Sequence, residues 1–288
     1  MVIQRIALHT PLSCFLATRC GALAQFFNQS TQKLFNSRIR YICCMKVKKD
    51  ILGIIPARGG SKAIPRKNIK PFCGKPLLAW AIETLKKSGI VDRVIVSTDE
   101  EEIAAVARMY GAEVPFMRPA ELAEDNTPTL PVLVHALSWL KERENYVPEY
   151  VVLFEPTSAA KRPYHVREIV EKLRATGADS VISVAEVPGV LNPMWQVTMA
   201  AHDRLSIFAG GPLKNFVPRR QSLPKTYYRN SSVYAFQSSL LFSPEPNIYG
   251  DDSRGCVVDK KFAFDIDEPS DWEAAEEKFK KILEEEKP

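Results

Sequence analysis

The chain has 288 residues, of which 45% are hydrophobic and 25% charged. This composition is ordinary for a soluble globular protein, and the length suits one large domain or two small ones. No uninterrupted apolar run approaches the roughly 18 residues that indicate a membrane-spanning helix, and no repeat period recurs. We therefore expect neither a membrane partner nor a repeat architecture.

The formal net charge of +5 is located in the first 44 residues, which carry five Lys or Arg side chains and no Asp or Glu. Removing those five from the 39 basic residues leaves 34, against 34 acidic residues, so the rest of the chain is formally neutral. A nucleic-acid-binding protein shows a basic excess in its folded part. We therefore expect no nucleic-acid partner.

Residues 1–44 form an extension with two open interpretations. Their basic, acid-free composition with scattered Ser and Thr is typical of a mitochondrial-type targeting segment. Alternatively, Met45 is the true start, because MKVKKDILGIIPA looks like a complete beginning and 1–44 is then an unstructured addition. We expect no catalytic residue here and place the functional domain at 45–288. Only Cys73 and Cys256 lie in that domain, which indicates a reducing compartment and a cytoplasmic location.

The domain begins with an apolar run at 51–55, which predicts a strand covered on both faces. Helices and strands then alternate, and such alternation implies parallel strands joined by right-handed crossovers. The predicted fold class is α/β, a three-layer α/β/α sandwich with a mostly parallel sheet. Helices are expected at 76–88, after a cap at Asp99, at 128–142 and at 163–175, with strands at 93–98, 112–116, 150–154 and 180–184.

The predicted alternation of helices and strands is interrupted at about 187–228, where prolines and glycines accumulate. We expect a projecting insertion, built as a hairpin rather than as a separate domain. The alternation resumes with predicted strands at 233–236 and 262–264. A last helix should begin near Ser270, capped with help from Glu273. Its core-facing residues are expected to be Trp272, Ala275, Phe279 and Ile282.

A glycine-rich basic loop follows the first strand directly, at 58–68. Its two adjacent glycines let backbone N–H groups approach an anion, and four cationic side chains lie within ten residues. A polyphosphate is the natural ligand of such a loop. A solvated basic turn is the alternative, disfavoured because ligands of α/β sheets bind at the carboxyl ends of strands. Neither G-x-x-x-x-G-K-[ST] nor G-x-G-x-x-G occurs.

Two carboxylates, Asp265 and Asp267, follow the last predicted strand. Residues two apart on a strand point the same way, so both can meet one hard cation. Magnesium (Mg2+) takes oxygen ligands and usually also holds substrate phosphates. Capping of the final helix is the alternative. Together with the phosphate loop, the pair indicates phosphoryl or nucleotidyl transfer, driven by positioning and electrostatic stabilisation.

These segments resemble a known family. The stretch IPARGGSKAIPRKNIKPFCGKPLL is similar to the signature of acylneuraminate cytidylyltransferases, and the resemblance extends over about residues 49–285. It implies a Rossmann-like nucleotide-diphospho-sugar transferase sheet with a projecting dimerisation insertion. The later motifs, in order, are VSTD at 96–99, RPAELAED at 118–125, PTS at 156–158, RRQSLP at 219–224 and DIDEPSDW at 265–272.

The resemblance implies a reaction between CTP and a 2-keto sugar acid that gives a CMP-sugar and pyrophosphate with Mg2+. The implied catalytic residues are Arg58, Lys62, Arg219, Arg220 and Asp267. Family members exchange the insertion across a homodimer, so Arg219 and Arg220 can serve the partner's site. The implied nucleotide-binding residues are Arg58, Gly60, Ser61, Lys67, Asn68, Arg118, Thr127 and Thr129, and the implied metal ligands are Asp265 and Asp267.

The implied sugar-binding positions are Glu155, Ser158, Lys161, Asn230 and Tyr234, and several depart from the family pattern. The family's Q-P-T-S-P-L-R reads EPTSAAK at 155–161, and its N-G-[AS]-[IF]-Y reads NSSVY at 230–234. Ala63 also replaces a usual glycine.

An anionic Glu155 beside an acidic sugar requires pairing with Lys161 or Arg162. We therefore hypothesise that the acceptor is not N-acetylneuraminate but a relative such as legionaminic or pseudaminic acid. A 3-deoxy-octulosonate-type acceptor and a non-catalytic nucleotide-binding relative remain alternatives.

Overall fold

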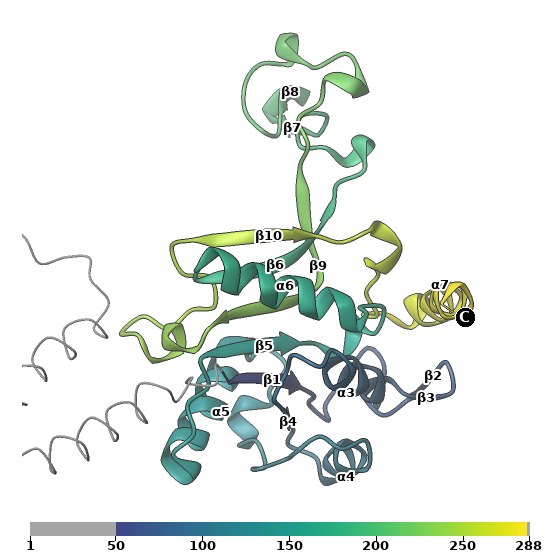
Figure 1. The fold of residues 1–288 in the computed structure, drawn as a ribbon. Helices are drawn as coiled ribbons and strands as arrows, with labels where there is room; N and C mark the ends of the chain where they lie inside the picture. Colours follow the sequence, from purple (N-terminus) through teal and green to yellow (C-terminus); the bar gives the residue numbers. More distant parts are fainter. Residues whose placement is uncertain (1–49, 287–288) are drawn as a thin grey trace, which may run out of the picture. The chain divides into compact units, whose positions relative to one another are not determined.

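A six-stranded sheet organises residues 50–286, the part of the chain that the computed structural model describes (Figure 1). The extension predicted at 1–44 lies outside these residues, as do the side chains of 230–232. The strands are parallel except β9, which runs antiparallel to both neighbours. Their order is β10-β6-β9-β5-β1-β4, with bounds β1 Ile51–Pro56, β4 Arg93–Ser97, β5 Tyr150–Phe154, β6 Ser180–Glu186, β9 Tyr227–Gln237 and β10 Ser253–Val257.

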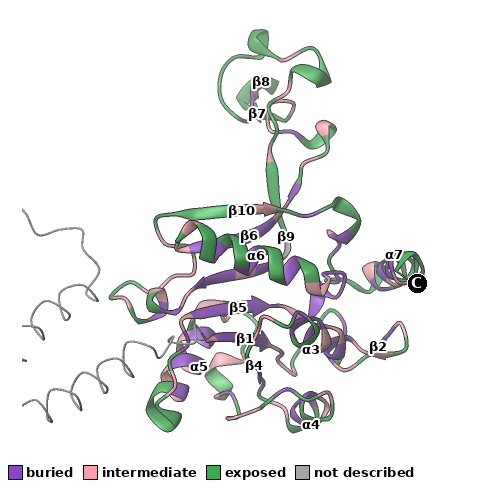
Figure 2. Cartoon of the chain, in the orientation of Figure 1, coloured by how far each residue is buried: buried purple, intermediate pink, exposed green. Residues whose placement is uncertain are grey.

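Helices cover both faces of the sheet, so the predicted three-layer α/β/α sandwich is confirmed. On one face α3 (Leu77–Lys87), α4 (Glu101–Met109) and α6 (Pro163–Thr176) bury an apolar cluster against alternate residues of β1 and β5. On the other face α5 (Thr129–Glu144) packs on the intervening residues. Because β1 and β5 are buried on both sides, their sequences are apolar at every position (Figure 2).

The last helix, α7 (Pro269–Glu285), closes a third apolar cluster beside α3 and the short hairpin of β2 (Pro71–Phe72) and β3 (Lys75–Pro76). All four residues predicted to face the core are buried. Within the cluster, the ring of Phe279 lies 5.5 Å from Phe72 and 4.7 Å from Trp80, centroid to centroid. This packing fixes the segment that precedes α7, which carries Asp265 and Asp267.

Four local predictions were wrong. Residues 112–116 form no strand, and only Glu113 among them makes an isolated bridge, to Ile95 of β4. Residues 262–264 are not a strand either, because Phe262 closes a 3-10 turn, and the edge strand is the exposed β10. Asp99 does not cap α4, whose N-cap is Glu100 without a side-chain bond. The last helix is capped by Glu268 and Asp271 rather than from Ser270 and Glu273.

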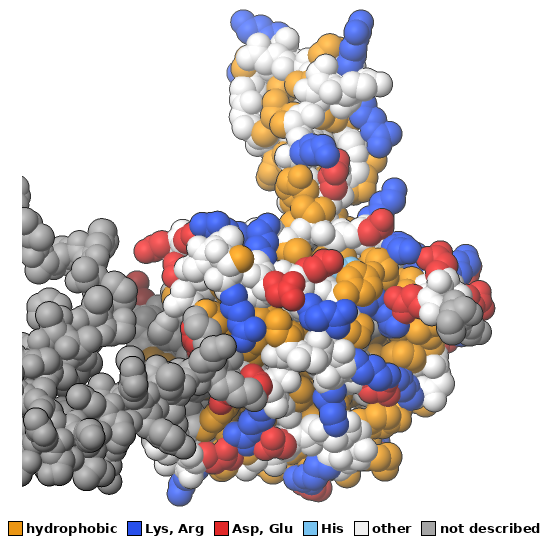
Figure 3. Space-filling view, viewed as in Figure 1, with side chains coloured by type: hydrophobic (Ala, Val, Ile, Leu, Met, Phe, Trp, Pro, Cys, Tyr) orange, Lys and Arg blue, Asp and Glu red, His pale blue; other side chains and the backbone are white. Residues whose placement is uncertain are grey.

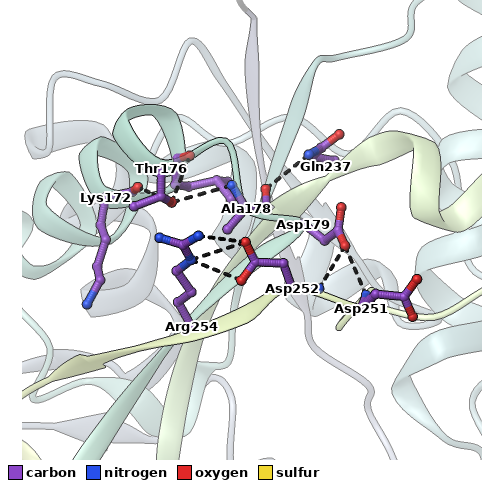
Figure 4. A network of polar contacts seen from close by, with 9 residues as sticks. Lys172, Thr176, Ala178, Asp179, Gln237, Asp251, Asp252 and Arg254 are labelled. Carbon is purple, nitrogen blue, oxygen red and sulfur yellow. Dashed lines mark hydrogen bonds and ion pairs between the residues drawn. The ribbon is translucent and has the colours of Figure 1, made fainter. Parts of the chain in front are cut away.

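Polar contacts fix the amino ends of β6 and β10, at the edge opposite the strands' carboxyl ends (Figure 4). One carboxylate oxygen of Asp179 accepts hydrogen bonds from the backbone N–H groups of Asp251 and Asp252, at 2.9 and 3.0 Å. The carboxylate of Asp252 in turn pairs with Arg254 at 2.7 Å. These contacts hold the edge strand in register with its neighbour.

The insertion between β6 and β9 projects from the sheet, as predicted (Figure 1). It contains an antiparallel hairpin of β7 (Val197–Ala200) and β8 (Arg204–Ile207). Most of its side chains are exposed, large apolar ones included (Figure 2). Among the described residues, no helix is both long and apolar enough to cross a membrane.

Replacing Phe279 with alanine should lower the free energy of unfolding by about 3–5 kcal/mol, because a fully buried aromatic ring leaves a cavity. Urea denaturation followed by far-UV circular dichroism measures this change. The control is Met109→Ala on α4, a side chain that is 79% exposed, which should change stability by less than about 0.5 kcal/mol. Equal effects of the two substitutions would contradict the packing described for α7.

Candidate active site

The carboxyl ends of β1, β4 and β5 meet at one edge of the sheet, and a cavity of about 300 Å³ opens there. Parallel pairing brings together segments that are far apart in the sequence. Most of the residues predicted to bind a nucleotide line this cavity, and an acid from the segment before α7 lines it as well. The predicted nucleotide-binding residues among them are Arg58, Lys67, Asn68, Arg118, Thr127 and Thr129, the acid is Asp267, and the predicted sugar contact Glu155 lines the cavity too.

The basic loop is shaped by bonds to its own backbone and to β4. The N–H of Gly59 donates to Asp99 Oδ1 at 3.0 Å, and the buried amide of Asn68 donates to the carbonyl of Arg58 at 2.8 Å. A Cβ at Gly59 would collide with Glu100, whereas Gly60 faces open space. Asn68 therefore sets the loop's conformation, and Gly60 leaves its backbone open to a ligand.

Arg58 and Lys62 share one acidic partner, Asp125, from the segment that follows the 3-10 turn at 120–122. Arg58 Nη1 lies 3.2 Å from Asp125 Oδ1 and donates to the carbonyl of Glu124 at 2.8 Å. Lys62 Nζ pairs with the other carboxylate oxygen. The hydrogen bond from Lys62 and the charges of both cations hold the pKa of Asp125 below its usual value.

Lys67 joins the basic loop to the acidic segment near the chain's end. Its Nζ donates to the carbonyl of Ile266 at 2.9 Å and lies 3.5 Å from Asp267 Oδ1. Ile266 is buried while Asp265 and Asp267 are exposed, so both carboxylates lie outward although this segment is not a strand. The structure thus brings together the two clusters that the sequence analysis singled out.

Arg118 is a buried cation at the same edge, only 6% exposed. Its Nε donates to Ser97 Oγ at 3.1 Å. Burial lowers the pKa of its guanidinium to about 10, which leaves the charge in place at neutral pH. A fixed, buried positive charge beside Arg58 favours an anionic ligand.

A second cavity, of about 330 Å³, adjoins the first and shares Thr129 and Glu155 with it. Arg229 lines it, and its Nη1 donates to the hydroxyl of Tyr249 at 2.7 Å. Burial and the charges of Asp265 and Asp267 raise the pKa of Glu155. The other lining residues are Leu130, Leu153, Tyr234, Asn247 and Ile248.

Neither Lys161 nor Arg162 pairs with Glu155. Lys161 is fully buried and lines neither of the two cavities, and its Nζ donates to the carbonyl of Phe262 at 2.6 Å. Arg162 pairs with Glu286 instead. The cations that act on Glu155 are Lys67 and Arg229.

Of the other predicted sugar contacts, one lines the second cavity and one lines neither cavity. Tyr234 lines the second cavity, whereas Ser158 is fully buried and lines neither. The side chain of Asn230 lies outside the described residues. Within one chain, therefore, only Glu155 and Tyr234 of the predicted sugar contacts are described in this pocket.

The two arginines of the insertion are not at this edge within one chain. Arg219 is exposed and lines none of the cavities described here. Arg220 packs over Gly189 in a separate cavity of about 440 Å³ at the base of the insertion. Any role for them in the site described here requires a second subunit.

Asp125, Arg229 and Tyr249 are among the residues of the site that were not predicted. Asp125 lies in the RPAELAED motif, which the sequence analysis used only for Arg118. Arg229 directly precedes Asn230, which was predicted to contact the sugar. This neighbouring position was the sequence feature that could have indicated Arg229 as a site residue. Tyr249 carried no signal, because it belongs to an irregular loop whose position depends on the tertiary fold.

In the described part of the chain, no group of three or more His, Cys, Asp or Glu is arranged to hold a metal. Asp265 and Asp267 supply two exposed carboxylates, which are hard oxygen donors. This donor set fits Mg2+, which is commonly bound by one or two carboxylates together with substrate phosphates and water.

An α/β sheet with cations and carboxylates at its carboxyl edge is the arrangement expected of a nucleotidyltransferase. The cytidylyltransferase family model matches residues 52–287, and the chain belongs to this family. The family model, together with the relatives described below, confirms the resemblance to acylneuraminate cytidylyltransferases, and the chain is a nucleotidyltransferase.

Two relatives from Campylobacter jejuni are each 32% identical to this chain. One is a CMP-N,N'-diacetyllegionaminic acid synthase, matched over 227 residues, 79% of this chain and 94% of the relative. The other is a pseudaminic acid cytidylyltransferase, matched over 224 residues, which are 78% of this chain and 94% of that relative. A solved CMP:2-keto-3-deoxy-manno-octonic acid synthetase complexed with CTP is 17% identical, with a TM-score of 0.59 over 82% of this chain and 99% of that one, and it shares the fold.

Burial of Lys161 should give the protein a measurable pH dependence of stability. Burial lowers the pKa of its ammonium from 10.5 to about 8. Between these values the unfolded chain holds the proton and the folded chain does not, so stability rises with pH. Relative to Lys161→Met, the wild type should gain about 1 kcal/mol per pH unit between about pH 8 and pH 10.

Urea denaturation at several pH values measures this difference. The matched control is Lys172→Met, because Lys172 also donates to a carbonyl, that of Gly255, but at the exposed surface. It should show a much smaller slope. A flat difference for Lys161→Met would show that the ammonium is not held in a buried site.

Proposed function

We propose that the protein transfers CMP from CTP to the anomeric hydroxyl of a sialic-acid-like 2-keto sugar acid, with release of pyrophosphate and dependence on Mg2+. The observation that carries this proposal is the meeting of the basic loop and the acidic pair, joined by Lys67. Beside this meeting point lies a second cavity with its own arginine, Arg229. One cavity therefore suits a nucleotide, and its neighbour suits an acidic acceptor.

The first cavity supplies charge for a triphosphate. Arg58 and Lys67 line this cavity, and Lys62 pairs with Asp125, which lines it too. These cations would neutralise a triphosphate, because positioned cations stabilise charge that develops on a departing pyrophosphate. Asp265 and Asp267 would hold Mg2+, which supplies further neutralisation of phosphate oxygens when bound. Positioning and fixed charge account for most of the catalysis of such transfers.

The second cavity supplies contacts for the acceptor. Arg229, held by Tyr249, offers a cation to the sugar's carboxylate. Leu130, Leu153 and Ile248 offer apolar surface for acyl and methyl groups. Glu155 lines both cavities, and burial together with the charges of Asp265 and Asp267 raises the pKa of its carboxyl group.

The changed sugar-side residues favour an acceptor other than N-acetylneuraminate. The relatives named for legionaminic and pseudaminic acid are consistent with that view. The test measures pyrophosphate release with CTP and Mg2+ and a panel of acids: N-acetylneuraminate, N,N'-diacetyllegionaminate, pseudaminate and 3-deoxy-manno-octulosonate.

We expect the highest kcat/KM with N,N'-diacetyllegionaminate or with pseudaminate. We expect no turnover when Mg2+ is removed with a chelator. Best turnover of N-acetylneuraminate would overturn the acceptor specificity alone. Highest kcat/KM with 3-deoxy-manno-octulosonate would show that the acceptor is a 3-deoxy-octulosonate-type sugar instead. Failure with every acid would overturn the proposed function.

We also propose that the protein is a homodimer whose insertion reaches the partner's site. Large apolar side chains on the insertion are exposed, including Val190, Met199 and Phe208. Residues 187–226 carry five Lys or Arg but one acid, and basic side chains surround the insertion's outer end (Figure 3). Arg219, without a described partner in its own chain, is then available to the partner's phosphate site.

Mixing two inactive variants should restore activity if the insertion is exchanged. In a mixed dimer of Arg58→Ala and Arg219→Ala subunits, one of the two sites is intact. Random assembly at equal amounts should therefore recover about a quarter of wild-type activity. Native mass spectrometry confirms that mixed dimers form. Mixed dimers without recovered activity would show that Arg58 and Arg219 serve a site within one chain.

A further inference from the structure

Two cations of the basic loop, Arg58 and Lys62, are already paired with a carboxylate. Arg58 and Lys62 bind opposite oxygens of Asp125, and Arg58 also holds the carbonyl of Glu124. Lys67 lies against Asp267 and Ile266 instead, and Arg118 against Ser97. Asp125 is thus the acid that neutralises this end of the loop.

The geometry of this contact is that of a bound phosphate. A carboxylate with one oxygen on a guanidinium and the other on an ammonium presents two anionic acceptors to two cations, as a phosphate group does. Any phosphate that binds between Arg58 and Lys62 must displace Asp125. The carboxylate and the phosphate therefore compete for the same donors.

The contact is readily exchanged. The side chain of Lys62 is 83% exposed and that of Asp125 31% exposed, and screening by solvent keeps such exposed ion pairs weak. Asp125 follows a short 3-10 turn in an exposed segment, so its release disturbs no core packing. A weak, local competitor can be displaced by a triphosphate and can return when pyrophosphate leaves.

We propose that Asp125 is a phosphate surrogate that sets the affinity of the site for CTP and for pyrophosphate by competing for Arg58 and Lys62. This inference rests on the proposed function. Competition acts on bound substrate and bound product alike, so it weakens ground-state binding without slowing the chemical step. Its value to the enzyme is release of pyrophosphate, which would otherwise be held by several cations.

The test is Asp125→Asn, which keeps the size of the side chain and removes its charge. Isothermal titration calorimetry of the full chain with inorganic pyrophosphate, and with CTP and Mg2+, should show both dissociation constants lowered about three- to tenfold. Steady-state assays should show a lower KM for CTP with kcat unchanged or reduced. The matched control is Glu121→Gln, in the same segment but not lining the cavity, which should leave both dissociation constants unchanged.

Unchanged or weaker binding of both ligands by Asp125→Asn would overturn the inference, since weaker binding would mean that Asp125 orients the two cations. Tighter binding of CTP without tighter binding of pyrophosphate would also overturn it. A wild-type protein that binds neither ligand would instead overturn the proposed function.

Discussion

The site depends on the contacts that the ammonium of Lys67 makes with the segment before α7. This ammonium bonds the carbonyl of Ile266, 199 residues away in the sequence, and lies beside Asp267. The sheet makes this contact possible, because parallel strands deliver the basic loop and Glu155 to one edge. Packing of α7 through Phe279 then fixes the acidic segment against that edge. These constraints bring the basic loop and the two carboxylates, which the sequence analysis singled out separately, to one edge of the sheet.

Four cations at this edge, Arg58, Lys62, Lys67 and Arg229, each contact an acidic or hydroxyl side chain. Arg58 and Lys62 share Asp125, Lys67 faces Asp267, and Arg229 rests on a tyrosine hydroxyl. The exposed ion pairs among these contacts are individually weak, which keeps the loops in place without blocking binding. Lys161 differs, because its ammonium is enclosed by protein and bonded to a carbonyl. The cations at the cavities can therefore contact a ligand, whereas Lys161 supports the fold.

Much of this organisation was predictable from residue patterns. The apolar runs of β1 and β5 and the spacing of Trp272, Ala275, Phe279 and Ile282 gave the sandwich and the last helix. The positions of Asp99 and Lys161 were not predictable, because a side chain's partner depends on tertiary contacts. Asp99 binds the phosphate loop rather than its own helix, and Lys161 points into the core. Strand β10 was missed because it is an exposed edge with no apolar run.

A crystal structure of the protein with CTP and Mn2+ tests the central claim most directly, since anomalous scattering locates the metal. The account predicts that Asp265 and Asp267 coordinate the metal and that Arg58 and Lys62 contact the triphosphate in the same cavity. A metal or a triphosphate bound elsewhere, for example in the cavity beside Arg220, would contradict it.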